Sequence, residues 1–306
     1  MSVNREDIVN CYRYILGRNP ENEDGISYAI NQFKDVDSLR KNMITSEEFS
    51  NIYRMMNIDI EKRKIQEEIQ EKIDEVNLIS SMYCYHPKKT NSSFFLPYVM
   101  TDFIQQTIFR SDNYYEIDNL EWVFKEFMSG VIGNDVKNSV ACDIGANIGN
   151  HTLYFLNELS AKKVISFEPM LKTFNILRKN VDLNNLNDHV ELHNVGVSNI
   201  EGNAESQQYD YTNIGASKIN VGNGNIKLVT LDSIDIPELT MMKIDVEGME
   251  LNVLQGAVKT IEKTHPYIML EAWGESINEV SKFLSDFGYK FKKMPMGLAD
   301  YIFWIE

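Results

Sequence analysis

From residue 140 onward, short apolar runs alternate with amphipathic helical segments, and this alternation constrains the fold more than any other feature. Runs typical of buried strands lie at 140–144, 163–168, 190–195, 242–246 and 267–271. Between them, apolar residues recur at helical spacing; one helix, for example, aligns Leu251, Leu254, Val258 and Ile261. Two last runs, 289–293 and 301–305, are close enough to pair as a hairpin. The pattern predicts an α/β fold, a doubly wound and mostly parallel sheet with an antiparallel strand.

The residues before this region show a different pattern, with helical periodicity in place of alternating strands and helices. Residues 1–57 predict a small all-helical accessory unit, with apolar helix faces in 8–16 and 26–33 and a third helix opening at Thr45. In 58–84, Ile65, Ile69 and Ile73 lie on one face of a predicted linker helix, which is either a spacer or, over 58–79, a dimer contact. The third region is 85–306, with its motif-bearing core at 140–306.

Composition excludes several classes of protein. The 306 residues include 30 basic and 45 acidic ones, a formal charge of −15, which argues against a nucleic-acid partner. We expect no membrane span, because no apolar run is long enough. Three scattered cysteines lack the spacing of a metal site and are typical of a reducing compartment, so we expect a cytoplasmic protein.

The strongest local motif directly follows the first predicted strand. Asp143, Gly145 and Gly149 form a D-x-G-x-x-x-G loop that opens a helix, and its small residues let the backbone approach a ligand closely. A tight strand-to-helix turn would need the same glycines. Glu168 ends the second predicted strand 25 residues later, where an acid can accept both hydroxyls of a ribose. Since no phosphate-binding G-x-x-x-x-G-K-[ST] loop occurs, the two motifs predict a nucleoside site.

Six segments in order carry a resemblance to a known family. DIGANIGNHTLYF, VISFEP, HNVGVSN, NIGAS, VTLDSI and above all KIDVEGMELNVLQGA resemble the FkbM-type S-adenosylmethionine-dependent methyltransferases over about 140–273. The resemblance implies a class I methyltransferase fold, Rossmann-like, with seven strands and the last one antiparallel. It also implies methyl transfer from S-adenosylmethionine, mostly to hydroxyl oxygens of sugars or other secondary products.

The resemblance also assigns site residues by position. Those around the methionine part and the sulfonium would be Asp143, Gly145, Ala146, Asn147 and Gly149. Glu168 would hold the ribose hydroxyls, and Asn194 and Val195 would lie beside adenine. In the first unit, the YILGRNP segment with Asp24-Gly25 and 46–49 resembles DUF4214-type helical modules.

Methylation of a hydroxyl needs a group that takes its proton or lowers its pKa. The candidates at predicted strand ends and loops are Asp245, Glu247, Glu271 and His151. Lys243 faces the same side as Asp245 and could pair with it. Asp245 and Glu271 close neighbouring strands, so we expect their carboxylates side by side. They could hold a divalent metal or, as we favour, act without one, with Asp245 as a direct base.

Three functions compete at this stage. The first is an O-methyltransferase acting on a hydroxyl of a carbohydrate, in a glycan or nucleotide-sugar context. The second is an RNA or protein methyltransferase; the charge of −15 counts against RNA, and an N-P-P-Y-type tetrapeptide is absent. The third is a non-catalytic binding module, against which the complete loop and Glu168 both count.

Overall fold

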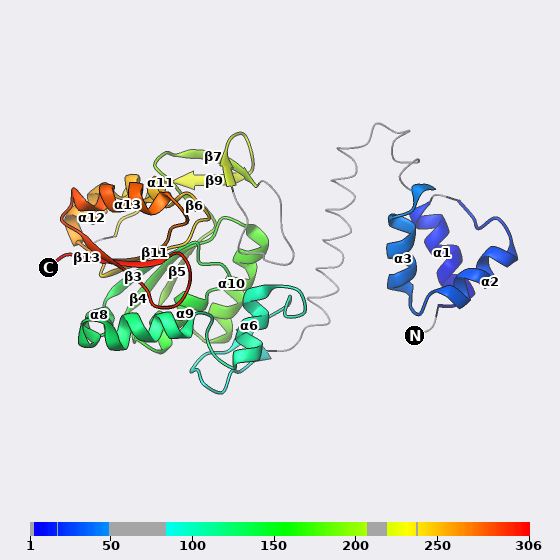
Figure 1. Ribbon diagram of the computed structural model, residues 1–306, viewed down its shortest axis with the longest axis horizontal. Coiled ribbons are helices and arrows are strands. Elements are labelled where there is room, and N and C mark those ends of the chain that lie inside the picture. Colours follow the sequence, from blue (N-terminus) through cyan, green and yellow to red (C-terminus); the bar gives the residue numbers. More distant parts are fainter. Residues whose placement is uncertain (1–2, 17, 49–83, 207–218, 237) are drawn as a thin grey trace. The chain divides into compact units, whose positions relative to one another are not determined.

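The computed structural model describes residues 3–16, 18–48, 84–206, 219–236 and 238–306 (Figure 1). The chain divides into two compact units, 1–80 and 81–306. The predicted helix and dimer contact at 58–79 and the NIGAS segment at 213–217 lie outside the described residues. In the described part, none of the helices combines the length and apolar character needed to cross a membrane.

The described part of the first unit is helical, as the sequence predicted. It contains α1 (Arg5–Ile15), α2 (Glu23–Gln32) and α3 (Val36–Ile44). Each begins at a capping side chain, Asn4, Asn22 or Asp35, which accepts a hydrogen bond from the backbone N–H three residues on. Helix α3 was not predicted, because only Leu39 and Met43 contribute to its buried side. The resemblance of this unit to DUF4214-type modules stays a prediction.

The second unit is built on a seven-stranded sheet in the order β12-β13-β11-β10-β3-β4-β5. Its strands are β3 (Val140–Ile144), β4 (Lys163–Phe167), β5 (Val190–His193), β10 (Met241–Ile244), β11 (Tyr267–Glu271), β12 (Lys290–Lys293) and β13 (Asp300–Trp304). Strands β3, β4, β5, β10 and β11 are parallel, and β13 is antiparallel to both β11 and β12. The predicted fold class, including the final hairpin, is confirmed.

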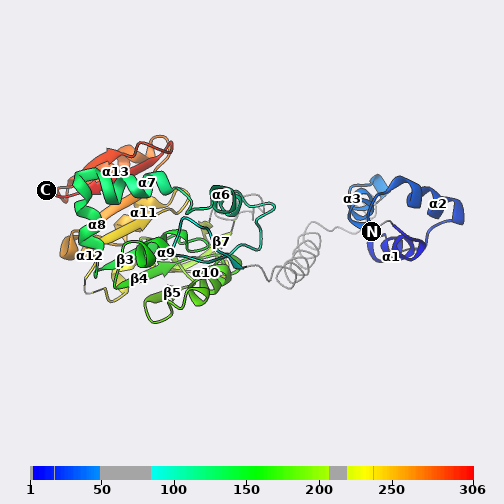
Figure 2. The ribbon, with the colours of Figure 1, turned by 90° about the horizontal axis from the view of Figure 1, so that it is seen from below.

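Helices cover both faces of this sheet. One face carries α8 (Val131–Val136) and α9 (Asn150–Asn157), and the other carries α11 (Glu250–Gln255), α12 (Val258–Thr264) and α13 (Ser276–Ser285) (Figures 1 and 2). Because side chains alternate along a strand, Ala141 packs into the apolar cluster of the first face and Cys142 into that of the second. Helix α10 (Leu171–Leu183) follows β4.

The helix predicted over 251–261 is in fact two helices, α11 and α12. They separate at Gly256, where an added Cβ would lie 2.0 Å from the carbonyl oxygen of Ser198. The Gly256 carbonyl accepts a hydrogen bond from the Asp232 N–H at 2.9 Å. The break therefore results from close backbone packing, which helical periodicity does not reveal.

A four-stranded sheet between β5 and β10 was also not predicted. Its order is β6-β9-β7-β8, from β6 (Gly196–Val197), β7 (Gly202–Ser206), β8 (Ile219–Val221) and β9 (Ile226–Val229). These strands are short, and β7 and β8 are largely exposed, so they lack the apolar runs of the main sheet.

Residues 84–139 belong to the second unit and pack on its first face. They form β1 (Cys84–Tyr85), β2 (Phe94–Phe95), α6 (Phe103–Ser111) and α7 (Ile117–Glu121), followed by a π-helix (Trp122–Glu126), a 3₁₀ turn (Phe127–Gly130) and α8. Phe94 and Leu120 are fully buried in the same apolar cluster as the core residue Phe155. This anchoring places the loop between α6 and α7 near the carboxyl ends of the strands.

Candidate active site

A cavity of about 340 Å³ opens where the parallel strands end. Residues at the ends of four of these strands line it: Gly145 follows β3, Glu168 follows β4, Asp245 follows β10, and Glu271 closes β11. Because parallel strands share one carboxyl edge, four motifs far apart in the sequence meet here, as open α/β sheets commonly arrange their ligand sites.

Gly145 allows the first loop to cross this edge. Its φ of +80° is in the left-handed region, and an added Cβ would lie 1.7 Å from the Asp245 carbonyl oxygen. The N–H groups of Gly145 and Ala146 both donate to the Phe167 carbonyl at 2.9 Å. The loop is therefore held against β4 and β10, with its backbone exposed to the cavity.

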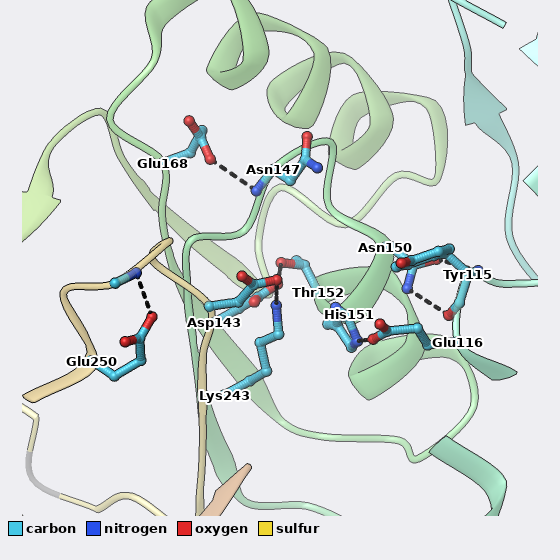
Figure 3. Close-up of polar contacts among 12 residues, drawn as sticks. Tyr115, Glu116, Asp143, Asn147, Asn150, His151, Thr152, Glu168, Lys243 and Glu250 are labelled. Atoms are coloured by element: carbon cyan, nitrogen blue, oxygen red, sulfur yellow. Dashed lines mark hydrogen bonds and ion pairs between the residues drawn. The ribbon is translucent and has the colours of Figure 1, made fainter. Parts of the chain in front are cut away.

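Glu168 faces the cavity with its carboxylate held by main-chain donors. Oε2 accepts from the Asn147 N–H at 2.9 Å (Figure 3). Oε1 accepts from the Met170 N–H, also at 2.9 Å. Burial raises the pKa of Glu168 to about 7, although these two hydrogen bonds favour the charged form. The acid predicted to hold ribose thus lies at the cavity wall, along with Val195.

Other predicted cofactor residues lie behind that wall. Of the described residues that line the cavity, none is Asp143, Ala146, Gly149 or Asn194. Asp143 is fully buried and accepts a hydrogen bond from Thr152 Oγ1 at 2.6 Å. The Asn194 side-chain amide donates to the carbonyls of Glu168 and Pro169 at 2.9 and 3.1 Å. The structure therefore places Asp143 and Asn194 as supports of the loops.

Asp245 is bound to a buried lysine, as the sequence predicted. Lys243 Nζ lies 2.9 Å from Asp245 Oδ2, and the lysine side chain is only 6% exposed. Burial alone would lower the pKa of Lys243, but its attraction to Asp245 and Asp143 more than reverses this, so the pKa is raised. The ammonium group is therefore a permanent positive charge under the acidic end of the cavity.

Glu271 lies next to Asp245, as expected from their neighbouring strands. Burial, followed by repulsion from Asp245 and Asp300, raises the pKa of Glu271 to about 8. Asp300, the first residue of β13, is the cross-strand partner of Glu271, and its pKa is raised to about 6, mainly by burial. Like charges paired across two strands favour retention of a proton by one of them.

Tyr115 and Glu116, before α7, also line the cavity and were not predicted. Asn150 holds their loop: its Oδ1 accepts from the Tyr115 N–H at 2.9 Å, and its Nδ2 donates to the Tyr115 carbonyl at 3.1 Å (Figure 3). Burial raises the pKa of Glu116 to about 7. No motif marks these residues; they belong to a stretch that is distinctive only for its aromatic content.

The remaining predicted catalytic residues differ in position. His151 is buried, does not line the cavity, and has its Nε2 3.7 Å from Glu116 Oε2. Burial lowers the pKa of His151 well below its usual value, so the ring is neutral. Because His151 does not line the cavity, it is not placed to contact the substrate directly. Glu247 lines the cavity, whereas Glu250 is buried and accepts from the Gly248 N–H at 2.8 Å.

The metal-assisted alternative stays open. Among the described residues, no group of three or more His, Cys, Asp and Glu side chains is arranged to hold a metal ion. Asp245 and Glu271 line the same cavity, and chelator treatment of a preparation that shows methyl-transfer activity distinguishes the two routes.

Raised carboxyl pKa values make stability depend on pH. The four groups concerned are Glu116, Glu168, Glu271 and Asp300. Each stabilises the fold below its unfolded-state pKa of about 4, and this contribution is lost as the pH rises through the folded-state value. We expect the melting temperature of the ligand-free protein to fall between about pH 5 and pH 8. A Glu168→Gln variant should show a shallower fall; a melting temperature that rises over this range would contradict the expectation.

The known proteins to which this chain is similar are methyltransferases. Residues 143–291 match the methyltransferase FkbM domain. The hexuronic acid methyltransferase AglP of Haloferax volcanii is 28% identical over 155 residues, covering 49% of this chain and 63% of that protein. Methyltransferase sdnD of Sordaria araneosa is 24% identical over 221 residues, covering 58% of this chain and 85% of that protein.

A solved structure is also similar. The crystal structure of methyltransferase FkbM from Methylobacillus flagellatus KT is 21% identical, with a TM-score of 0.42, and the match covers 56% of this chain and 44% of that chain. The match with the present chain therefore spans less than two thirds of the Haloferax relative and less than half of this solved chain.

Proposed function

We propose that this chain, whose residues 143–291 form a domain of the methyltransferase FkbM family, transfers a methyl group from S-adenosylmethionine to a hydroxyl of an uncharged sugar. One observation carries the proposal: a single cavity has a nucleoside-type wall at Gly145 and Glu168 and an acidic, aromatic wall at Asp245, Glu271 and Trp273. A cofactor in the first part would face an acceptor in the second.

The residues of the first part have the chemistry that S-adenosylmethionine requires. The missing side chain of Gly145 leaves room at the loop, and Glu168 offers a carboxylate to ribose hydroxyls. Asn147 Oδ1 is buried with no hydrogen-bond partner among the described residues, and such an acceptor suits the ammonium group of the methionine part. Val195 adds an apolar surface for adenine. When bound, the cofactor supplies an electrophilic methyl group.

The second part has the features of a sugar site. Trp273 and Phe103 line it and are each 57% exposed, so their ring faces can cover the C–H face of a pyranose. The carboxyl groups of Glu116, Asp245 and Glu271 can accept hydrogen bonds from hydroxyls. Aromatic faces and carboxylates together favour a flat ring that carries several hydroxyl groups.

The charge of this part favours an uncharged sugar over a uronic acid. Besides Glu168, four acidic residues line the cavity, and the buried Lys243 is paired with one of them, Asp245; the four are Glu116, Asp245, Glu247 and Glu271. A substrate carboxylate would meet like charges, which cost of the order of 1–3 kcal/mol in a partly desolvated site. We therefore expect an acceptor that differs from the one in the name of the Haloferax relative.

A methyl-transfer assay with labelled S-adenosylmethionine tests both statements. We expect neutral hexosides to be methylated with a kcat/KM roughly tenfold or more above that of the matched hexuronides. RNA and a protein mixture serve as alternative acceptors in the same assay. Preference for the uronides would contradict the charge argument, and label in RNA or protein alone would contradict the sugar acceptor. Absence of cofactor binding by calorimetry would favour a non-catalytic module.

A further inference from the structure

We propose that Glu116, from the loop between α6 and α7, accepts the proton of the acceptor hydroxyl, and that His151 behind it is a positioning residue. This inference rests on the proposed methyl transfer. It assigns the reaction a residue that lies outside the matched domain at 143–291. The sequence favoured Asp245 for this role, and the geometry points to Glu116 instead.

The backbone at Glu116 is held in a conformation that needs support. Its φ is +56°, in the left-handed region, which costs a non-glycine residue of the order of 1 kcal/mol or more. Asn150, at the start of α9, holds the preceding residue with two hydrogen bonds, at 2.9 and 3.1 Å. Strained residues that are held in this way are concentrated at functional sites. Here the strain aims a carboxylate into the cavity from a packed segment.

The other carboxyl groups of the wall are less suited to accept a proton. Asp245 is bound to Lys243 Nζ at 2.9 Å, so one of its carboxylate oxygens already accepts a hydrogen bond from a buried ammonium group. Glu271 is paired with Asp300 across two strands, and its pKa of about 8 leaves it mostly protonated at neutral pH. Asp245 and Glu271 are thus placed to orient hydroxyl groups, as an acceptor and as a donor.

His151 provides a second observation that points to Glu116. Its Nε2 is buried without a hydrogen-bond partner among the described residues, and it lies 3.7 Å from Glu116 Oε2 (Figure 3). The ring is neutral, so Nε2 can accept a hydrogen bond when Oε2 carries a proton. The separation of 3.7 Å is longer than a hydrogen bond, so the neutral imidazole accepts from a protonated Glu116 only when the two atoms move closer.

Several titratable groups face Glu116 from the elements packed around it. Lys243 and Asp245 lie on or after β10, Glu271 closes β11 and Asp300 begins β13. Tyr115 is its neighbour in the loop, and the neutral His151 lies on α9. Burial and the two aspartates raise the pKa of Glu116 to about 7, while Lys243 opposes them. A base whose pKa is near the working pH is the most effective proton acceptor.

The proton transfer balances in a simple way. The hydroxyl O–H bond breaks and its proton goes to Glu116, while the acceptor oxygen bonds to the methyl carbon. The electron pair of the broken carbon–sulfur bond stays on sulfur, which becomes neutral. The proton on Glu116 returns to solvent after product release, and the site is restored.

The test compares Glu116→Gln, Glu116→Asp and the control Glu126→Gln, which changes an exposed glutamate of the next helical segment. We expect Glu116→Gln to lower kcat by roughly a hundredfold or more, with the cofactor Kd within about twofold of wild type. Wild-type kcat should rise with pH through about 7, and Glu116→Gln should lose this rise. Glu116→Asp should recover part of the rate, and Glu126→Gln should behave as wild type.

A measurement without turnover accompanies these rates. The melting temperature of the ligand-free Glu116→Gln variant should fall less than that of wild type as the pH rises to 8, because the group whose pKa burial has raised is gone. A Glu116→Gln variant with wild-type kcat and pH profile would overturn the role of Glu116 as proton acceptor and leave the proposed function standing. A wild-type protein that binds the cofactor but methylates no sugar would overturn the proposed function together with it.

Discussion

Replacement of Lys243 by methionine should lower the free energy of unfolding at pH 8 by about 3–5 kcal/mol, the range expected when one partner of a buried ion pair is removed. The lysine is 5% exposed and lies 2.9 Å from Asp245, with Asp143 on the adjacent strand β3. Methionine keeps the length of the side chain but leaves these carboxylates without a counter-charge. Denaturant-induced unfolding, followed by a spectroscopic signal from the second unit, measures the change in the free energy of unfolding.

Acidification and a second variant separate charge from packing. Burial raises the pKa of Asp143, so acidification protonates this neighbour of Lys243 and the loss caused by Lys243→Met should shrink. The double variant Lys243→Met/Asp245→Asn should be more stable than the single one at pH 8. As a control, Lys125→Met removes an exposed ion pair with Glu121 and should cost less than about 1 kcal/mol. An equal loss at acid and alkaline pH would show that packing, not charge, is responsible.

The sequence predicted that the residues of the proposed cofactor end would meet, because its motifs directly follow strands. Gly145 and Glu168 each come immediately after a strand of the parallel sheet, so their meeting at one cavity follows from topology alone. How deeply each side chain of a motif lies below the cavity was harder to predict. Asp143 is the fourth residue of β3, and it is directed to Thr152 of α9 beneath the loop. A motif shows which loop meets a ligand, but it does not show which of its side chains reach the cavity.

The acceptor end could be predicted only in part. Asp245 follows β10 and Glu271 closes the neighbouring β11, so their position at one edge of the sheet was expected. Glu116 and Asp300 come from a loop before the core and from the start of the final hairpin, and only tertiary packing brings them together. The hydrogen bonds between Asn150 and Tyr115 join residues 35 positions apart. Such long-range contacts have no periodic signature in the sequence.

Replacement of Glu168 by alanine should weaken the binding of S-adenosylmethionine by roughly ten- to a hundredfold, the scale of losing charge-assisted hydrogen bonds. The carboxylate lines the cavity at the end of β4, where it can accept ribose hydroxyls. It also accepts from the N–H groups of Asn147 and Met170, so the alanine variant removes loop support as well. Isothermal titration calorimetry at pH 8 gives the affinity.

Ribose contact and loop support can be told apart with a modified ligand. If Glu168 binds the ribose, a 2′-deoxy analogue of S-adenosylhomocysteine should bind wild type more weakly than the parent does, and the difference should vanish in Glu168→Ala. Since the pKa of Glu168 is raised to about 7, wild-type affinity should also increase as the pH rises from 6 to 8, because the ionised carboxylate is the stronger acceptor. Glu168→Gln keeps one acceptor oxygen for the loop but should lose this pH dependence. Equal sensitivity of wild type and Glu168→Ala to the missing hydroxyl would remove Glu168 from the ribose site and leave it as a support of the loop.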